Sequence, residues 1–365
     1  MKVKNLVVGC GFSGATIAER LANELGESVL IIDRREHLAG NCYDYQDLNG
    51  ITIHKYGPHI FHTNDDEVWD YISKFATWQP YSHEVLAFVD GDVIPIPFNF
   101  NSLEQKFPQK AKEWEEKLIV KYSKDKKISI LELEKDLEFK ELADFIYEKI
   151  FLNYTQKQWG LKPEELDKSV FSRVPVMLGY DNRYFQDKYQ AMPESYSGII
   201  ENMLSNPLIE VRLGVEFSQI KDNLEYERLF FTGAIDEFFD YEFGALPYRS
   251  LDLKFQTLDC KYFQPKAVVN YPNDNDFTRI TEFKHFLGEQ SEKTVILKEF
   301  PEQFEVGKNE RFYAILNEKN RELYQKYLAK AKDVIFLGRL GDYQYYDMDK
   351  AIKRALEVFE ALKCK

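Results

Sequence analysis

The chain has 365 residues, of which 44% are hydrophobic and 15% aromatic, so it can bury a large core and divide into two or three domains. Its 48 Lys and Arg against 61 Asp and Glu give a net charge of -13, which disfavours binding to nucleic acid or to an anionic membrane surface. It has no apolar run long enough to span a bilayer, and a strand begins at once with no signal peptide, so we expect a cytoplasmic protein.

Four cysteines, at positions 10, 42, 260 and 364, lie far apart, and none belongs to a CxxC pair. This spacing predicts neither a disulfide framework nor a zinc site, and we expect no metal. Cys10 falls in a glycine-rich turn, where a small buried residue is expected rather than a nucleophile.

Residues 4–33 have the pattern around which the rest of the chain is organised. An apolar strand at 6–8 leads into a glycine-rich turn, a helix is predicted over 13–25, and a second strand at 29–32 ends at Asp33. The order strand, turn, helix, strand and carboxylate is typical of a dinucleotide-binding βαβ unit.

Each residue of this fingerprint has a mechanical task. Gly9 permits the sharp turn, Gly11 lets the backbone approach a pyrophosphate, and Gly14 lets helix and strand pack closely. The phosphates would lie at the positive helix N-terminus, and Asp33 would accept hydrogen bonds from a ribose. The alternative, a glycine-rich turn without a ligand, is less favoured because both strands, the helix and the acid are present.

The next part of the chain predicts an insertion into the nucleotide fold. A helix is expected to begin at Asn64 with Glu67 completing a capping box. Residues 85–89 and 93–96 predict a hairpin, because the Asp-Gly pair at 90–91 suits positive φ angles.

Residues 102–160 are strongly helical in pattern. Capping boxes are predicted at Ser102 with Gln105 and at Ser129 with Glu132. The apolar residues that recur at helical spacing are Phe139, Leu142, Ala143, Ile146, Tyr147 and Ile150.

The second half of the chain predicts a return to the nucleotide sheet. A helix is expected at 197–204, a strand at 210–213, and an apolar strand from Arg228 that meets Gly233. Further strands are expected at 251–258, 267–270, 279–283, 295–298 and 334–337, with helices over 318–331 and from Met348 to about 362.

The fold class expected from these elements is α/β. It comprises a discontinuous Rossmann-type FAD-binding domain with an inserted helical domain and an antiparallel β-sheet domain. The expected boundaries are 1–80, 190–235 and 318–365 for the first, 100–170 for the helical domain, and 81–99, 176–189 and 236–317 for the sheet domain. Such insertions favour flavin over nicotinamide, because large flavin enzymes interrupt the nucleotide fold in this way. The polar stretch near 163–176 could be a mobile loop that acts as a lid, although from its residues alone an ordinary connector is the default.

Several motifs then make the prediction specific: GCGFSG, DRREHLAGN, YGPHIFHT, NYTQKQWG, FSRVPV, DNRYFQDKYQAMP, FFTGAID, TRITEFKHF and GRLGDYQYYDMD. Together, from residue 6 to residue 354, they resemble the bacterial UDP-galactopyranose mutases. The resemblance implies a homodimer with FAD and an antiparallel six-stranded sheet. The implied reaction interconverts UDP-galactopyranose and UDP-galactofuranose with no net redox change, and it supplies galactofuranose for cell-surface polysaccharide.

The implied mechanism requires a reduced flavin, and therefore an external reductant such as NAD(P)H. Flavin N5 attacks the anomeric carbon, UDP departs but stays bound, and the sugar ring opens and recloses on the covalent flavin adduct. The protein has to position the groups and stabilise charge, and no catalytic triad is visible.

The resemblance also implies residue roles. Arg173, in a closing loop, and Arg279 would hold the diphosphate, with Tyr184, Tyr313 and Tyr345 as further phosphate contacts; arginine suits this role because its planar donors pair bidentately with phosphate. The substrate-binding set expected is Phe151, Tyr154, Thr155, Trp159, Arg173, Tyr184, Phe185, Arg279, Tyr313, Tyr345 and His83. Phe151 and Tyr154 would stack on uracil, and Trp159 would lie near the sugar.

The expected cofactor-binding set spans both ends of the chain: Gly9, Gly11, Phe12, Ser13, Gly14, Asp33, Arg34, Asn41, His59, Ile60, Gly233, Arg339, Tyr345, Asp347 and Met348. The expected catalytic set is Arg173, Arg279, His59, His62, Tyr345 and Asp347, in which the histidines orient groups near the flavin.

Each role has a structural alternative. The arginines could form surface ion pairs, and Phe151, Tyr154 and Trp159 could be core aromatics of a helical domain. The histidines could be core residues, and metal ligation is disfavoured because no acidic or cysteine partner sits at ligand spacing.

Two departures from the resemblance bear on substrate and flavin. His83 stands where an asparagine reaching toward the sugar is common, so an N-acetylated or deoxygenated galactose remains possible. Ala39 replaces a frequent glycine in the flavin segment.

Two other classes share some of these features. A FAD-dependent amine oxidase or desaturase would carry the nucleotide fingerprint but would consume an oxidant and needs no paired-arginine clamp. A non-catalytic dinucleotide-fold protein would bind without turnover, and a colourless protein would favour a lost site.

Overall fold

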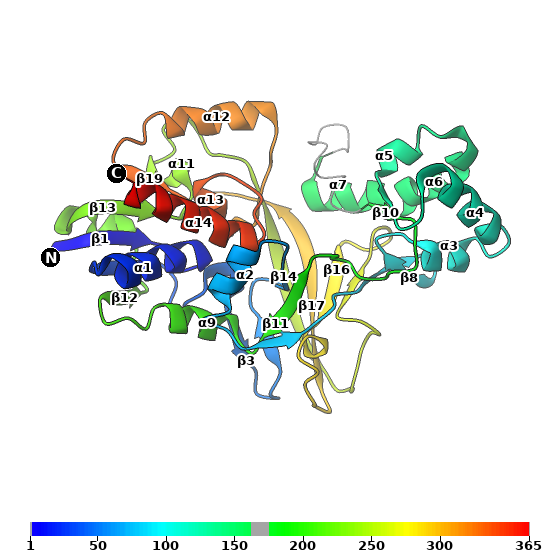
Figure 1. The fold of residues 1–365 in the computed structure, drawn as a ribbon, viewed down its shortest axis with the longest axis horizontal. Coiled ribbons are helices and arrows are strands. Elements are labelled where there is room, and N and C mark those ends of the chain that lie inside the picture. Colours follow the sequence, from blue (N-terminus) through cyan, green and yellow to red (C-terminus); the bar gives the residue numbers. More distant parts are fainter. Residues whose placement is uncertain (1, 162–174, 365) are drawn as a thin grey trace. The chain divides into compact units, whose positions relative to one another are not determined.

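A computed structural model describes residues 2–161 and 175–364, and the chain forms two compact units (Figure 1). Unit 1 comprises Met1–Tyr81, Asp187–Tyr248 and Tyr313–Lys365, and unit 2 comprises Ser82–Gln186 and Arg249–Phe312. Unit 1 is discontinuous, and the helical stretch and the larger sheet both belong to unit 2. The expected division into three domains stays a prediction.

The centre of unit 1 is a parallel sheet, which in the described chain has the order β12-β2-β1-β13-β19. Its strands are β1 (Lys2–Val8), β2 (Val29–Asp33), β12 (Ile209–Leu213), β13 (Glu225–Phe231) and β19 (Val334–Phe336). All five residues of β2 are buried, as expected for a central parallel strand. The predicted α/β fold and the return of the late strands to the first βαβ unit are therefore confirmed.

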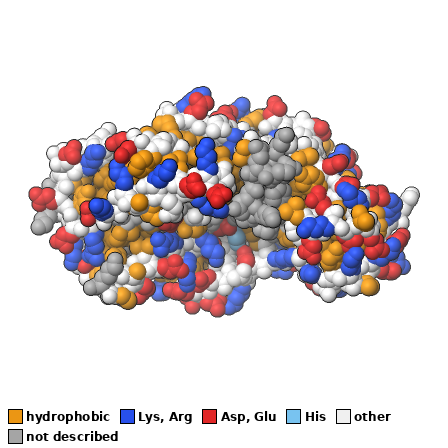
Figure 2. Space-filling model, turned by 90° about the horizontal axis from the view of Figure 1, so that it is seen from above, with side chains coloured by type: hydrophobic (Ala, Val, Ile, Leu, Met, Phe, Trp, Pro, Cys, Tyr) orange, Lys and Arg blue, Asp and Glu red, His pale blue; other side chains and the backbone are white. Residues whose placement is uncertain are grey.

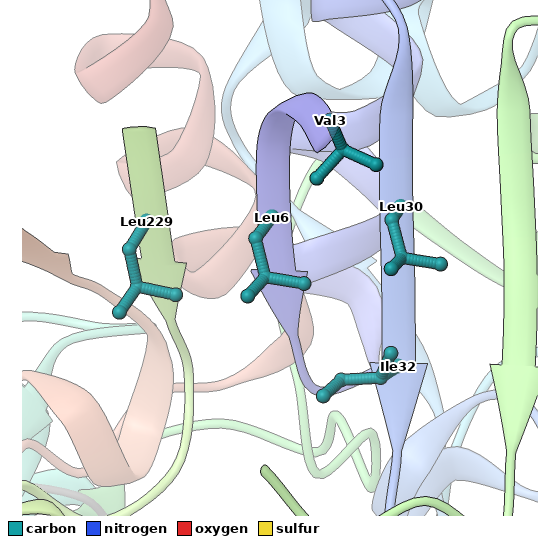
Figure 3. Close-up of a cluster of buried hydrophobic side chains, with 5 residues drawn as sticks. All are labelled: Val3, Leu6, Leu30, Ile32 and Leu229. Atoms are coloured by element: carbon teal, nitrogen blue, oxygen red, sulfur yellow. The ribbon is translucent and has the colours of Figure 1, made fainter. Parts of the chain in front are cut away.

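The two faces of this sheet are covered by different elements. Figure 3 shows a buried cluster on one face, which joins neighbouring strands β13, β1 and β2. Side chains of α10 (Phe217–Ile220) and α11 (Ile235–Phe238) pack against this cluster. The cluster consists of Val3, Leu6, Leu30, Ile32 and Leu229. The opposite face carries α1 (Phe12–Leu25), which contacts α9 (Tyr196–Met203) and α14 (Met348–Lys363). The first and last helices of the chain thus lie side by side.

Unit 1 also has two small antiparallel sheets. One has the order β5-β11-β6, formed by Phe61–Thr63, Tyr189–Pro193 and Trp78–Pro80, and the other pairs β3 (Asp44–Gln46) with β4 (Thr52–His54). The other elements of unit 1 are η1 (Gly40–Cys42), α2 (Asp66–Ile72), η5 (Lys221–Asn223), β18 (Tyr313–Ala314), α12 (Glu318–Leu328) and α13 (Gly338–Gly341).

The largest sheet of unit 2 has the strand order β14-β17-β16-β15-β7-β8 among the described residues. These strands are β14 (Tyr248–Leu258), β17 (Thr294–Gln303), β16 (Arg279–Glu282), β15 (Val268–Asn270), β7 (Val85–Val89) and β8 (Asp92–Ile96). The expectation of a wholly antiparallel sheet was wrong, because β15 pairs with β7 in parallel. The β7–β8 hairpin comes from a much earlier part of the chain, so no tight turn fixes its direction relative to β15.

The helices of unit 2 follow the predicted helical stretch. They are α3 (Phe100–Lys106), α4 (Ala111–Tyr122), α5 (Ile130–Leu133), α6 (Lys140–Ile146), the π-helical segment η3 (Tyr147–Leu152) and α7 (Asn153–Trp159). Short elements complete the unit: β9 (Lys127–Ile128), η2 (Leu137–Phe139), β10 (Val176–Met177) and η6 (Phe283–His285). Five of the six apolar residues predicted at helical spacing are buried, and Tyr147 is half-buried.

Two of the predicted helix caps were wrong. Helix α2 is capped by Asp65, whose side chain accepts from the N–H of Val68, because Asn64 bonds Asp187 and Lys188 instead. Helix α3 begins earlier than predicted, with Asn99 as its cap and Ser102 as the third residue of the box. The cap at Ser129 is confirmed, but its side chain accepts from the N–H of Leu131 and not from that of Glu132, as the predicted box requires. The hairpin across residues 90 and 91, which both have positive φ, is confirmed.

The described residues contain no helix that is both long and apolar enough to cross a membrane. On the face that Figure 2 displays, acidic and basic side chains are interspersed.

Candidate functional site

The glycine-rich turn between β1 and α1 is held together by close backbone packing. Gly9 has a φ of +101°, and a Cβ added there would lie 1.9 Å from the hydroxyl oxygen of Thr232. A Cβ on Gly14 would lie 1.9 Å from the carbonyl oxygen of Gly9. The chain itself therefore requires both glycines, one for the turn and one for close helix packing.

Gly11 differs from its two neighbours in the motif. Its φ of −85° is open to any residue, and an added Cβ would meet only ordinary contacts, at 3.8 Å from Gly40 and 3.9 Å from Ala39. No described residue therefore explains why a glycine stands there. Gly11 is the N-cap of α1, which has no side-chain cap and no acidic residue in its first turn. A helix N-terminus whose first N–H groups have no side-chain cap, and whose cap position carries no side chain, fits an approaching phosphate.

Asp33 fastens this turn to the end of β2. Its carboxylate accepts from the N–H of Cys10 at 2.8 Å and from the N–H of Arg35 at 2.9 Å, and it is buried. Burial and the nearby Asp33 raise the pKa of the Cys10 thiol far above its usual range, which supports a small buried residue there. The contact between Asp33 and a ribose stays a prediction.

Other expected cofactor residues surround the same turn. Arg35 donates to the side chain of Asn41 at 2.9 Å, Arg34 pairs with Glu237 at 3.1 Å, and buried Phe12 packs edge-on against Tyr196. Ala39, which replaces the frequent glycine, adopts a left-handed φ of 68°, and its N–H donates to the carbonyl of Cys10 at 2.9 Å. This backbone is strained for alanine by about 1 kcal/mol.

The residues that closely follow strands β13 and β19 also lie near the glycine-rich turn. A Cβ on Gly233 would lie 2.7 Å from the Phe231 ring. Gly338, which the sequence reasoning missed, has a φ of +84°, and a Cβ there would lie 2.9 Å from the hydroxyl oxygen of Ser13. The available signals were a glycine directly after a predicted strand and its place as the first residue of the motif GRLGDYQYYDMD. The turn after β19 therefore approaches the first turn of α1, and Thr232, directly after β13, lies against Gly9 of the glycine-rich turn.

His59 is held through its backbone. Its N–H donates to Nδ1 of His54 at 3.0 Å, and its carbonyl accepts from the hydroxyl of Tyr196 at 3.1 Å. Burial lowers the pKa of His54 from 6.5 to about 4, so its ring is neutral and can accept this hydrogen bond. The residue following it, Ile60, is half-buried.

His62 pairs with Asp187, with Nδ1 and Oδ2 2.5 Å apart. Asp187 lies 125 residues from His62 in the sequence and reaches it through the pairing of β11 with β5, so local spacing could not reveal this partner. The described residues contain no group of three or more His, Cys, Asp or Glu side chains arranged to hold a metal ion.

Arg339 and two tyrosines form a cluster in unit 1. The rings of Tyr313 and Tyr345 stack with centroids 5.5 Å apart, and the Arg339 guanidinium lies 5.0 Å from the Tyr345 ring. Arg339 Nε also donates to the carbonyl of Tyr346 at 3.0 Å. Asp347 is the N-cap of α14, which begins at Met348 as predicted. The structure thus brings three predicted site residues together.

In unit 2, Arg279 is the first residue of β16 and stands opposite Glu299 of β17. Its Nε lies 2.7 Å from Oε1 of Glu299, and the two side chains are 25% and 1% exposed. Directly opposed residues of an antiparallel pair have adjacent Cβ atoms, so the strand register itself produces this ion pair. Glu299 was missed, because the register could not be read from the sequence.

His83 is buried in an aromatic cluster of unit 2. Its ring centroid lies 6.0 Å from that of Tyr184, 5.8 Å from Phe185 and 6.2 Å from Phe286. Its carbonyl accepts from the N–H of Tyr184 at 2.7 Å. The structure therefore joins three residues that the sequence assigned to substrate binding.

The expected nucleotide-binding aromatics differ in exposure. Phe151 is only 8% exposed and Thr155 is buried, whereas Tyr154 and Trp159 are half-buried. The burial of Phe151 favours core packing, and its stacking on uracil stays a prediction. Arg173 and most of the expected mobile loop lie outside the described residues.

Comparison with known proteins decides the family. Residues 149–345 match the family model for UDP-galactopyranose mutase, and residues 7–75 match a model for an NAD(P)-binding Rossmann-like domain. The chain belongs to the UDP-galactopyranose mutase family.

Relatives and a solved structure agree with this assignment. A probable UDP-galactopyranose mutase of Klebsiella pneumoniae is 38% identical over 98% of this chain and 94% of its own. A dTDP-fucopyranose mutase of Escherichia coli is also 38% identical, over 97% of both chains. The crystal structure of a reduced UDP-galactopyranose mutase matches the fold with a TM-score of 0.76 at 16% identity, covering 100% of this chain and 94% of that one.

Proposed function

We propose that this protein is a flavin-dependent mutase that interconverts UDP-galactopyranose and UDP-galactofuranose without net redox change. The observation that carries the proposal is the 38% identity to the Klebsiella pneumoniae relative over 98% of this chain.

The proposed cofactor is FAD. The open space at Gly11, the uncapped start of α1 and the turns at Gly233 and Gly338 fit a dinucleotide whose pyrophosphate approaches the backbone. The residues that would hold it are those of the turn, with Asp33, Arg34, Asn41 and Arg339. When bound and reduced, the flavin supplies an electron-rich nitrogen, N5, to the anomeric carbon.

The chain's own residues bind, orient and stabilise charge. Arg279, oriented by the buried Glu299, would hold a diphosphate oxygen, and Arg173 would supply a second guanidinium. Tyr184, Tyr313 and Tyr345 would donate hydroxyls to phosphate, and Tyr154 and Trp159 would bind the uracil and the sugar. His59 and His62 would orient groups near the flavin, since the backbone of one and the ring of the other have partners that fix them.

A second substrate is favoured by one observation. The relative from Escherichia coli, equally similar to this chain, is named for dTDP-fucopyranose, which lacks the 6-hydroxyl of galactose. The replacement of a polar asparagine by His83, buried against Phe185 and Phe286, is compatible with a deoxygenated sugar. The mutase reaction would be the same, and only the nucleotide sugar would change.

Two experiments test the function and the substrate. Dithionite-reduced protein should interconvert UDP-galactopyranose and UDP-galactofuranose, while the oxidised protein should be nearly inactive; equal rates in both states would refute the role of the reduced flavin. Parallel assays with dTDP-fucopyranose then compare kcat/KM for the two substrates. Consumption of an oxidant in proportion to product would instead indicate an oxidase.

We also propose a cytoplasmic homodimer that receives electrons from a reductant such as NAD(P)H and supplies galactofuranose for cell-surface polysaccharide. The family resemblance supports this assembly and role. Light scattering on purified protein tests the dimer, and a mass of about 43.1 kDa, that of one chain, would refute it.

A further inference from the structure

Lys157 of α7 has an unusual environment. Its Nζ lies within hydrogen-bond distance of four backbone carbonyl oxygens, at 2.5 Å from Tyr271, 2.9 Å from Asn275, 3.2 Å from Phe277 and 3.3 Å from Asn273. An ammonium has three hydrogens to donate, so at least one is shared between two acceptors. These carbonyls form a ring of oxygens around a positive charge, as in a monovalent cation site.

The four carbonyls belong to the segment 271–278, which joins β15 to β16. Its described backbone hydrogen bonds include one from the N–H of Tyr271 to the carbonyl of Thr278, at 2.8 Å, which closes the segment. Without the ammonium, carbonyls that point toward one another would have to be separated by water. Arg279 follows this segment directly, so the position of Lys157 bears on the position of that guanidinium.

Arg249 of β14 binds the backbone at the C-terminal end of the same helix. Its Nε donates to the carbonyl of Gln158 at 2.9 Å and its Nη2 to the carbonyl of Lys157 at 3.2 Å, and the side chain is buried. The last carbonyls of a helix lack partners within the helix and carry partial negative charge, so a cation there is stabilising. Gly160, with a φ of +65°, ends the helix, and a Cβ on it would lie 2.8 Å from Nη1 of Arg249.

A third link joins the same elements. The side chain of Asn153 donates to Oδ1 of Asn273 at 3.0 Å, and the side chain of Asn273 donates to the carbonyl of Lys149 at 3.1 Å. Helix α7 is therefore connected to the segment before β16 by a cation and an amide, and to β14 by a second cation.

We propose that Lys157 and Arg249 are positioning residues that hold α7, and with it Tyr154 and Trp159, in fixed register with Arg279 of β16. Neither cation is assigned a contact with substrate. Their importance for turnover rests on the proposed function, in which Tyr154, Trp159 and Arg279 bind a nucleotide sugar.

The first test measures the protein without substrate. In Lys157→Ala, amide hydrogen exchange across residues 271–278 should quicken by about tenfold or more, since buried charged hydrogen bonds are lost. Lys149→Ala is the matched control, because its ammonium pairs only with half-exposed Asp90 at 2.9 Å among the described side chains. Unchanged exchange in Lys157→Ala would overturn the proposal.

The second test uses a small amine to separate the cation from the side chain that carries it. Propylammonium should fill the oxygen ring in Lys157→Ala and restore slow exchange, and it should have no effect on the wild type. Absence of rescue in a folded variant, judged by an unchanged flavin spectrum, would show that the ring is not a cation site and would refute this part of the proposal.

The third test connects the positioning role to nucleotide binding. Lys157→Ala and Arg249→Met should weaken UDP binding, measured by calorimetry, by about tenfold, whereas Arg249→Lys should recover part of the loss. If the wild type binds no UDP but the exchange results hold, the proposed substrate fails and the positioning role survives. If UDP binds equally well to all variants, the positioning role fails and the proposed substrate survives.

Discussion

Replacement of Gly11 by alanine should affect the stability of the apoprotein and the binding of the cofactor differently. Because the added methyl group would lie 3.8 Å or more from its nearest described neighbours and φ is −85°, the apoprotein has room for it. Alanine restricts the unfolded chain more than glycine does, which stabilises the folded protein by about 0.4–1 kcal/mol, but it is a poorer helix N-cap, which destabilises it by a similar amount. The free energy of unfolding should therefore change by less than about 1 kcal/mol.

Flavin binding should respond differently. A methyl group at the N-cap keeps a pyrophosphate from approaching the first N–H groups of α1, and each charge-assisted hydrogen bond lost costs about 1.5–3 kcal/mol. The dissociation constant for FAD should therefore rise by about 10- to 100-fold for one such bond.

Gly14→Ala is the matched control within the same motif. Its methyl group would lie 1.9 Å from the carbonyl oxygen of Gly9, so backbone has to move, at a cost of about 1–3 kcal/mol or more even without cofactor. Urea unfolding of the two apoproteins and titration with FAD measure both quantities. The reasoning is refuted if Gly11→Ala binds FAD as the wild type does, or if it destabilises the apoprotein as much as Gly14→Ala.

Three further predictions concern the site, its pH dependence and the core. Arg279→Ala should lower kcat/KM by about 100-fold or more by removing charged hydrogen bonds to the diphosphate, with the flavin spectrum unchanged, and a loss below about fivefold would exclude that contact. Folding lowers the pKa of His54 from 6.5 to about 4, so the unfolded chain binds a proton at this residue more readily than the folded chain does. The stability that comes from keeping this ring neutral is complete above pH 6.5 and is lost as the pH falls toward 4. The free energy of unfolding should therefore decrease by about 2 kcal/mol between pH 7 and pH 5. Urea unfolding of His54→Gln at both pH values should show a smaller difference. Phe230→Ala should cost about 3–5 kcal/mol, because the ring is fully buried, whereas exposed Leu48→Ala should change stability by less than about 0.5 kcal/mol in the same assay.

Several elements of both units could be predicted because their signals are local. Strands β1 and β2, the helix between them and the hairpin at residues 90–91 follow from apolar periodicity and glycine geometry within short windows. The family motifs likewise pointed to Arg339 and Tyr345, which the structure places together. These features need no knowledge of which distant strands pair.

Apart from the start of α3, whose cap Asn99 is local, the misses involve partners that are distant in sequence. Asn64 was taken for a cap, yet its side chain bonds residues more than 120 positions away. Asp187 and Glu299 meet His62 and Arg279 only because particular strands pair in a particular register. The sheet order, including the parallel contact of β15 with β7, decides these pairs, and no local pattern encodes that order.

The nucleotide turn shows why even a clear motif is incomplete by itself. The space left by Gly9 is filled by Thr232, and Gly338 must lack a side chain because Ser13 occupies the space where its Cβ would be. Both residues follow strands that join the sheet late in the chain. The βαβ unit at the start can therefore form a strand, a turn and a helix, but the surroundings of the turn are complete only after β13 has added to β1 and β19 to β13. A chain truncated before β19 would retain the fingerprint and lose the wall of the site that Gly338 provides.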